Sequence, residues 1–197
     1  MLRWTIPILC VIALAALPLT GDDVLVQYGI DALLFATLAQ AWNILGGFAG
    51  YVSFGNSSFY GLGTYGTAIA MAQFHWPFGL GLALGAFLAV ACAVLFGIPI
   101  LRLRGHYFAI ATLGLSATLA AIIANLDISG KNIGLILPLT RADNAFYEEA
   151  LILLVAATAT VAWIARSRVG EALLAIREDE DAALAMGINT TRYKIIA

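Results

Sequence analysis

Long apolar stretches alternate with short polar segments along this chain of 197 residues. A helix needs about 20 predominantly apolar residues to cross the hydrocarbon core of a bilayer, and several of the stretches approach that length. Most charged residues fall between the stretches. The pattern therefore predicts an all-α fold, a polytopic transmembrane helical bundle that forms a single domain over residues 1–197. Six spans are expected, at about residues 5–19, 32–48, 58–74, 78–101, 107–126 and 150–165.

Composition supports a membrane protein and excludes a soluble domain. Hydrophobic residues make up 62% of the chain and charged residues 11%, and the mean hydropathy is +0.93; only a multi-span membrane protein combines these values. The first stretch, which follows the basic residue Arg3, has features of a signal peptide. We favour a retained span, because residues 18–20 make a poor cleavage site and a second span follows at once.

The least helix-like part of the chain joins the second and third expected spans. Glycines recur from Gly46 to Gly66, and each glycine inside a helix costs up to about 1 kcal/mol relative to alanine. Two interpretations compete: the glycines let helices pack closely, or residues 46–57 form a broken or re-entrant segment that lines a cavity. Neighbouring serine and asparagine side chains favour the broken segment. The candidate residues for a translocation pathway are Asn43, Gly47, Gly50, Ser53 and Asn56.

Three hydroxyl side chains, those of Thr112, Ser116 and Thr118, lie within the fifth expected span. Such hydroxyls either donate to carbonyls of their own helix or face a polar pathway. We favour bonding within the helix, and the pathway remains the alternative.

The only long charged segment extends from Arg166 to Lys194. It predicts two short helices joined by the acidic residues 178–181, because acidic side chains favour a helix N-terminus and Gly187 suits the left-handed residue that ends a helix. The second helix carries a narrow stripe of small apolar residues, which a partner could grip, at Ala182, Ala185 and Met186. An ordinary amphipathic helix on the lipid headgroups is the simpler interpretation of this segment alone.

The distribution of basic residues predicts the orientation. With the N-terminus in the cytoplasm, eight basic residues lie inside and only Lys131 and Arg141 lie outside, which obeys the positive-inside rule. The eight are Arg3, Arg102, Arg104, Arg166, Arg168, Arg177, Arg192 and Lys194. The loop of residues 166–192 is therefore expected in the cytoplasm.

Four blocks of sequence resemble, in order, the permeases of ABC importers for branched-chain amino acids, the LivM-like family. The first three are residues 43–66, the string L-R-L-R-G-x-Y-F-A-I-x-T-L within 101–113, and residues 128–135. The fourth, residues 167–194, contains a run similar to the EAA-x-x-x-G coupling loop of ABC permeases. The chain departs from the family pattern with Asp181 for the leading Glu, Asn56 for a frequent His and Lys131 for a usual Gly.

The resemblance implies a transmembrane permease subunit in a bacterial cytoplasmic (inner) membrane, which carries branched-chain or related amino acids. Two ATP-binding cassette subunits would bind the cytoplasmic loop and hydrolyse ATP, a LivH-like second permease would complete the pore, and a periplasmic or extracellular protein would deliver substrate. Residues 193–197 resemble the start of a further span, so the chain is expected to be C-terminally incomplete. The implied ATPase-coupling residues are Asp179, Glu180, Asp181, Ala182, Ala183, Met186 and Gly187.

The alternative function is an ion-coupled secondary transporter or channel. Such proteins use charges inside the membrane or ion sites at broken helices. The glycine-rich segment is compatible with this, but no expected span carries a pair of charges near its middle. No Walker A string G-x-x-x-x-G-K-[ST] and no catalytic or zinc-binding motif is present, so a transport subunit without its own cofactor is expected, and no catalytic or metal-binding residue is assigned.

Overall fold

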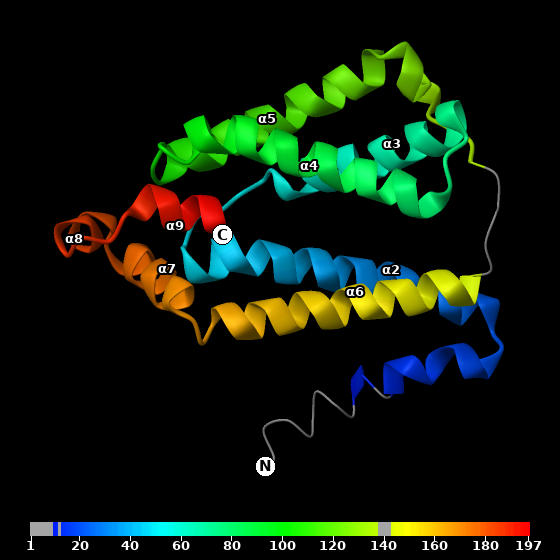
Figure 1. Ribbon diagram of the computed structural model, residues 1–197, viewed down its shortest axis with the longest axis horizontal. Coiled ribbons are helices and arrows are strands. Elements are labelled where there is room, and N and C mark those ends of the chain that lie inside the picture. Colours follow the sequence, from blue (N-terminus) through cyan, green and yellow to red (C-terminus); the bar gives the residue numbers. More distant parts are fainter. Residues whose placement is uncertain (1–9, 12, 138–142) are drawn as a thin grey trace. The chain divides into compact units, whose positions relative to one another are not determined.

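The computed structural model describes residues 10, 11, 13–137 and 143–197, and every regular element within these residues is helical (Figure 1). The chain forms two compact units: residues 1–44 with 139–171, and residues 45–138 with 172–197. In chain order the elements are η1 (Leu17–Thr20), α2 (Asp23–Trp42), the π-helical turn η2 (Asn43–Phe48), α3 (Asn56–Phe74), α4 (Phe78–Ile100), α5 (His106–Asn125), η3 (Asp127–Ser129), η4 (Lys131–Ile133), α6 (Asp143–Ile164), α7 (Arg168–Glu178), α8 (Glu180–Ala185) and α9 (Thr190–Ile196).

The predicted helical membrane bundle is confirmed. Among the described residues, four helices are long and apolar enough to cross a membrane: Asp23–Phe48, Phe78–Ile100, His106–Asn125 and Ala145–Ile164. The expected third span coincides with α3, which has 19 residues but is less apolar because of its glycines, serines and threonines. Residues 5–9 and 12 of the expected first span lie outside the described residues, as do Arg3 and Arg141.

In the first unit, α2 and α6 pack side by side (Figure 1). Val26, Leu33 and Ala150 surround the fully buried Tyr147 in their core. A glycine at position 29 permits this close packing, because a Cβ there would lie 2.6 Å from the Tyr147 ring.

Both helices of this unit begin earlier than the sequence suggested. Asp22 caps α2, its carboxylate accepting hydrogen bonds from the backbone N–H groups of residues 24 and 25 at 3.0 and 3.3 Å. This cap starts the helix at Asp23 rather than at residue 32. Likewise α6 begins at Asp143 rather than at residue 150, because a helix continues through polar residues beyond the apolar stretch that reveals it.

In the second unit, α3 and α4 form a closely packed helical hairpin. A Cβ added at Gly85 would lie 2.2 Å from the carbonyl oxygen of Gly63, and one at Gly66 would lie 3.0 Å from the Cα of Gly85. The helix-packing interpretation of the glycines is therefore correct for Gly63 and Gly66. At Gly61 it is not supported, because nothing lies within 4 Å of an added Cβ.

The broken-segment interpretation is confirmed for the preceding glycines. The helix that starts at Asp23 passes into the π-helical turn η2, stops at Phe48, and resumes only at Asn56. Residues 49–55 have no regular secondary structure, and we call them the break. A positive φ of 72° at Gly50 suits glycine at the point where the helix ends.

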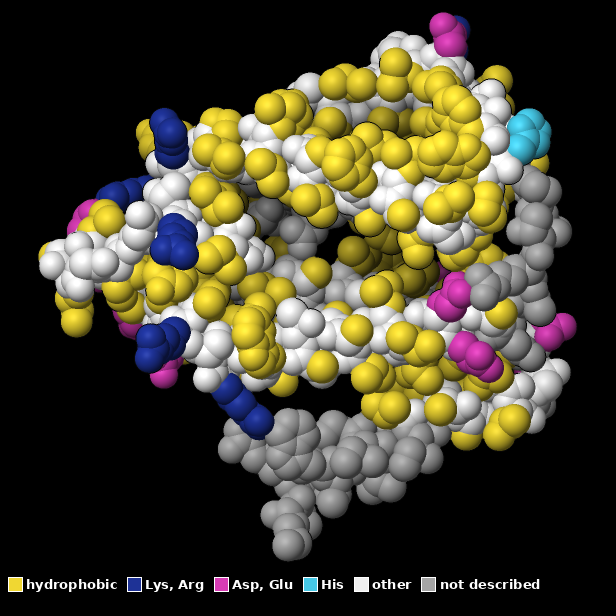
Figure 2. Space-filling view, in the orientation of Figure 1, with side chains coloured by type: hydrophobic (Ala, Val, Ile, Leu, Met, Phe, Trp, Pro, Cys, Tyr) yellow, Lys and Arg dark blue, Asp and Glu magenta, His cyan; other side chains and the backbone are white. Residues whose placement is uncertain are grey.

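Helix α5 completes the second unit, with Cys92, Leu115 and Leu119 as a small apolar core. Large apolar side chains on the outside of α4 remain exposed, among them Phe87 and Leu95 at 67% and 68%. Hydrophobic side chains cover most of the visible surface of α4 and α5 (Figure 2). Such a surface suits contact with lipid or with another membrane subunit.

Candidate functional site

The loop that follows α6 folds as the sequence predicts, into two short helices separated by one residue. Asp179 lies between α7 and α8 and caps α8, because its carboxylate accepts hydrogen bonds from the backbone N–H groups of Asp181 and Ala182 at 2.9 and 3.0 Å. Gly187 ends the turn with a φ of 86°, and its N–H donates to the carbonyl of Leu184 at 2.9 Å. Both the acidic start and the glycine stop are confirmed.

Helix α8 has one face turned into the protein and one turned away from it. Ala183 is 2% exposed, and the Glu180 side chain is 13% exposed. The opposite face carries Ala182, Ala185 and Met186, all exposed, with Met186 at 82%. The small apolar stripe predicted from the sequence is thus available to a partner, whereas Ala183 and Glu180 have roles within the chain.

Glu180 is the centre of a cluster of polar side chains from four parts of the second unit. We call Tyr51, Arg104, Glu180, Asp181 and Lys194 the Glu180 cluster. The Lys194 ammonium lies 2.8 Å from one Glu180 oxygen, and the Tyr51 hydroxyl donates a short hydrogen bond to the other. The ammonium also donates to the Tyr51 hydroxyl at 3.2 Å and lies 4.7 Å from the centre of the Tyr51 ring.

The inner part of the Glu180 cluster is buried and its outer part is exposed. The Lys194 side chain is 2% exposed, and the Tyr51 ring packs edge-on against Phe108 with ring centres 5.1 Å apart. Arg104, whose side chain is 51% exposed, lies 2.6 Å from Asp181 and 3.6 Å from Glu180. Exposed ion pairs contribute little to stability, so the pair of Glu180 and Lys194 is the contact that holds α8.

The surroundings of Glu180 keep it ionised. Burial alone would raise its pKa, but hydrogen bonds from Lys194, Tyr51 and Thr190, together with the charge of Lys194, lower the pKa below the ordinary value of a glutamate. The pKa of Arg104 is raised, first by its hydrogen bond to Asp181 and then by the charges of Glu180 and Asp181. At neutral pH Glu180 and Arg104 therefore carry opposite charges.

A second contact joins the loop to the break. Arg177, near the end of α7, donates a hydrogen bond of 2.9 Å to the backbone carbonyl of Gly47 in the π-helical turn. Its side chain also covers Gly50, where an added Cβ would lie 2.9 Å from the Arg177 Cγ. π-Helical turns occur frequently at functional sites. With Tyr51 in the Glu180 cluster, the end of this turn and the start of the break are thus held by residues of the loop region.

Helix α5 supplies hydrogen bonds to the other side of the break. The Thr112 hydroxyl accepts from the backbone N–H of Phe54 at 3.1 Å, and the Ser116 hydroxyl donates to the Phe54 carbonyl at 2.8 Å. Both hydroxyls also bond within α5, and Thr118 bonds to the carbonyl of Gly114. The prediction of bonding within the helix is therefore correct for all three, but for Thr112 and Ser116 it missed the larger role of satisfying the backbone where the helix is broken.

The predicted pathway residues lie in or beside the break. Asn43 begins the π-helical turn and Asn56 begins α3, and both are half-buried. Ser53 is buried at 7% exposure and its hydroxyl accepts from the N–H of Gly55 at 3.2 Å. Gly47 and Gly50 contact Arg177, as described above. Their role in a pathway stays a prediction.

Sequence reasoning missed the residues that join the loop to the membrane helices. Arg104 and Lys194 were counted only as positive charges on the inner side, and Tyr51 only as one residue of the glycine-rich segment. Their pairing depends on a fold that brings α9 against α4 and α8. The one available signal was the presence of a glutamate and a lysine 14 residues apart on either side of the Gly187 turn.

Comparison with known proteins gives a consistent result. Residues 24–197 match a family model described as branched-chain amino acid transport system / permease component. The chain is 28% identical to the high-affinity branched-chain amino acid transport system permease protein LivM of Salmonella typhimurium, and 27% identical to LivM of Escherichia coli strain K12. Each comparison covers 84% of this chain and 46% of the relative, so the chain spans about half the length of these relatives. No solved structure matches the chain.

Proposed function

Because the chain belongs to the family of branched-chain amino acid transport system permease components, we propose that it is a transmembrane subunit of an ABC importer. A separate ATPase docks on the loop of residues 166–192 and supplies the energy for transport. The substrates are branched-chain or related amino acids, in line with the names of the relatives. The chain itself is an integral membrane protein with apolar helices that suit a bilayer.

The observation that carries this proposal is the division of α8 into a held face and an exposed face. Met186 is 82% exposed, and Ala182 and Ala185 lie beside it on the same short helix. Such an apolar stripe is more favourably placed against a partner than in water. Methionine and small side chains suit a partner that must fit closely against a helix. On the other face, Glu180 joins the helix to Tyr51 of the break and to Lys194 of α9, so a force on α8 reaches them.

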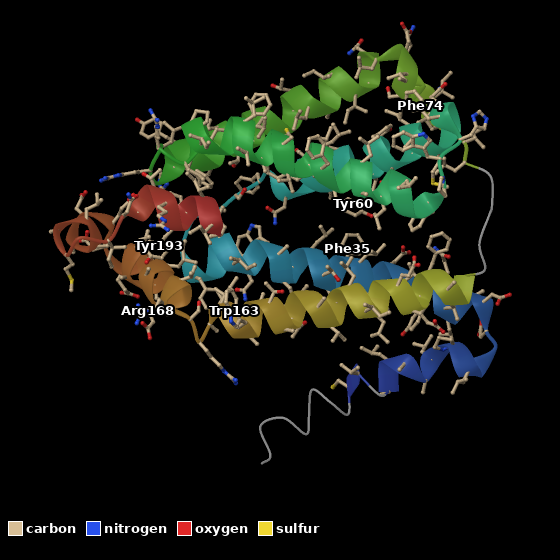
Figure 3. All side chains as sticks on the ribbon, in the orientation of Figure 1. Phe35, Tyr60, Phe74, Trp163, Arg168 and Tyr193 are labelled. Atoms are coloured by element: carbon tan, nitrogen blue, oxygen red, sulfur yellow. The ribbon has the colours of Figure 1, made fainter. Side chains whose placement is uncertain are left out.

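The proposed orientation places the loop in the cytoplasm, together with the N-terminus. In the second unit, Arg104 and the loop contacts lie at the start of α5, whereas Lys131 follows the other end of that helix. An α-helix of 20 residues is about 30 Å long, which separates the two groups by the thickness of a membrane core. In the first unit, Trp163 is near the end of α6 and Arg168 begins α7 (Figure 3); a tryptophan at a span end followed by a basic residue is typical of a cytoplasmic interface.

The proposed transport cycle follows the contacts outward from α8. ATP binding closes two ATPase subunits and moves α8 with them. The Glu180–Tyr51 and Arg177–Gly47 hydrogen bonds transmit that movement to the end of the π-helical turn and to the break that follows it. Since the break has no regular secondary structure to maintain, it can change conformation at low cost and open the pathway to alternate sides. A LivH-like second permease and a periplasmic or extracellular binding protein complete the system.

The test is capture of the candidate ATPase subunit by the full-length parent protein, purified in detergent. Met186→Glu should reduce capture about tenfold or more, because it places a charge at the centre of a close contact. The matched control is Ile133→Glu, which makes the same kind of change at a residue that is 92% exposed beyond the opposite end of α5. Capture should be unchanged in this control.

Uptake by proteoliposomes then separates the importer from an ion-coupled transporter. An importer takes up leucine only when the ATPase subunits and ATP are present. Uptake that persists without them, or that follows an imposed ion gradient, would contradict the proposal. Equal capture of the ATPase by wild type and by Met186→Glu would show that the exposed face of α8 is not the docking site.

A further inference from the structure

A cavity of about 530 Å³ lies between α3 and α5 in the second unit. Its volume falls within the range of small-molecule sites, roughly 300 to 1,000 Å³. None of the five predicted pathway residues lines it. The cavity therefore needs an explanation of its own.

The lining of the cavity changes in character along its length. Ser57 and Ser58, in the first turn of α3, and Ser116 supply hydroxyl groups. Ser116 lies halfway along α5, where its hydroxyl also bonds the break. Toward the end of α5, Leu119 and Ile123 supply an aliphatic wall. The cavity thus extends from the level of the break toward the end of α5 that is remote from the loop helices.

Among the described residues that line the cavity, Lys131 is the one that carries a charge. Lys131 follows α5 and its side chain is 60% exposed, which places it at the mouth of the cavity. The residue has a φ of 54°, a left-handed conformation that costs an ordinary residue about 1 to 2 kcal/mol. Its ammonium lies 2.6 Å from the Asp127 carboxylate, and an ammonium has three protons to donate, so it can bind a second carboxylate as well.

We propose that this cavity binds a small aliphatic amino acid on the outer side of the break. The substrate carboxylate contacts the Lys131 ammonium, and its hydrocarbon side chain extends into the cavity and packs against Ile123 and Leu119. The identity of the ligand rests on the proposed function. The existence of a site for an aliphatic carboxylate rests on the lining of the cavity alone.

Protection of a single cysteine tests the site directly. Ala120 lines the cavity, so Ala120→Cys is introduced into the full-length protein after Cys10 and Cys92 are replaced. The rate of labelling by a water-soluble thiol reagent is measured with and without leucine, with the partner subunits present. At ten times the half-saturating concentration, leucine should slow labelling about tenfold, since about one site in eleven is then empty. Ile133→Cys, exposed outside the cavity, should label at the same rate in both conditions.

Two substitutions at one position isolate the role of the charge. In the Ala120→Cys background, Lys131→Asn removes the ammonium while asparagine still tolerates the left-handed backbone. It should raise the concentration of leucine needed for protection about tenfold or more, because a hydrogen bond to a charged group is lost. Lys131→Arg keeps the charge and should restore protection. Leucinamide, which lacks the carboxylate, should protect the cysteine at position 120 only weakly when Lys131 is present, and equally weakly after Lys131→Asn.

The possible outcomes separate the cavity from the proposed function. Protection by leucine that depends on the charge at position 131 supports the site, whether or not uptake requires ATP. Equal labelling with and without leucine overturns the site, even where ATP-dependent uptake of leucine is normal. Protection that is unchanged by Lys131→Asn overturns the assignment of the carboxylate to this lysine.

Discussion

The substitution Glu180→Gln removes one charge from the Glu180 cluster while it keeps the shape of the side chain. The amide can still accept from Tyr51, but it cannot balance the ammonium of Lys194, whose side chain is 2% exposed. Arg104 keeps its contact with Asp181 at 2.6 Å. The substitution therefore acts on the buried part of the cluster and leaves the exposed face of α8 unchanged.

The magnitude follows from the burial of the pair. Removal of one partner from a buried ion pair costs about 3 to 5 kcal/mol, because the remaining charge loses its compensation. We therefore expect Glu180→Gln to reduce the free energy of unfolding by about 3 to 5 kcal/mol.

Thermal unfolding of the purified full-length protein in detergent measures this loss. Lys194→Met and the double variant complete a thermodynamic cycle. The double variant has no buried charge left uncompensated, so it should be more stable than Glu180→Gln alone. We expect a coupling energy of about 2 kcal/mol or more between the two positions. Glu178→Gln, an exposed carboxylate at the end of α7, is the matched control and should change stability by less than about 0.5 kcal/mol.

The pH dependence provides an independent check on the same pair. The pKa of Glu180 is lower in the folded protein than in the unfolded chain. A carboxylate of this kind stabilises the fold above its unfolded pKa, and the stabilisation is lost as the pH falls through its lower, folded pKa. Wild type should therefore exceed Glu180→Gln in stability at neutral pH. The difference should shrink as the medium is acidified below the ordinary pKa range of glutamate.

Transport measurements complete the test. Glu180→Gln should still capture the ATPase, because Met186 and the other exposed residues of α8 are unaffected. The ratio of leucine uptake to ATP hydrolysis should nevertheless fall below that of wild type. Loss of capture would show that Glu180 contacts the partner itself. Unchanged stability together with a normal ratio of uptake to ATP hydrolysis would refute the idea that the Glu180–Lys194 pair holds α8.

Three further expectations concern the glycines and the break. Gly85→Ala should lower the free energy of unfolding by about 1 to 3 kcal/mol or more, because its Cβ would lie 2.2 Å from a backbone oxygen of α3. Gly114→Ala has open space around it and should be neutral or slightly stabilising. Equal effects of the two substitutions on thermal unfolding would contradict the packing argument. Gly187→Val should abolish uptake but not membrane insertion, because a β-branched residue is strained at a φ of 86°. Gly187→Asn should retain part of the uptake activity. Normal uptake by a well-inserted Gly187→Val protein would refute the need for a left-handed residue. Cysteines placed at three predicted pathway positions should react with small aqueous reagents during transport, and uniform protection would count against a pathway there. The positions are Asn43, Ser53 and Asn56.

Local chemistry made much of the loop predictable. An acidic residue that caps a helix and a glycine that stops one act within a few residues, so the cap of α8 at Asp179 and the left-handed turn at Gly187 after it follow from the sequence. The exposed stripe at Ala182, Ala185 and Met186 follows from helical spacing. The break was likewise indicated by the density of glycine and polar residues between two apolar stretches.

Helix boundaries and long-range pairs were less accessible. The cap at Asp22 starts α2 nine residues before the expected span, because apolar length marks where a membrane lies and not where a helix begins. The pair of Glu180 and Lys194 requires a reversal of the chain at Gly187, and its contact with Tyr51 joins residues 129 positions apart. Residue type indicated that these side chains were polar, but not that they would be buried together.

The break explains why these distant contacts are needed. A chain that leaves the helical conformation beside apolar helices must find hydrogen-bond partners for its backbone, since each unsatisfied group would cost several kcal/mol in a membrane. Thr112 and Ser116 of α5 satisfy the backbone of Phe54, and Arg177 satisfies the carbonyl of Gly47 from the loop side. One group of bonds comes from a membrane helix and the other from the helix that precedes α8. A movement of the loop therefore acts on the π-helical turn and the break, which α5 holds on the other side. The break is thus the place where hydrogen bonds from the loop region and from α5 meet.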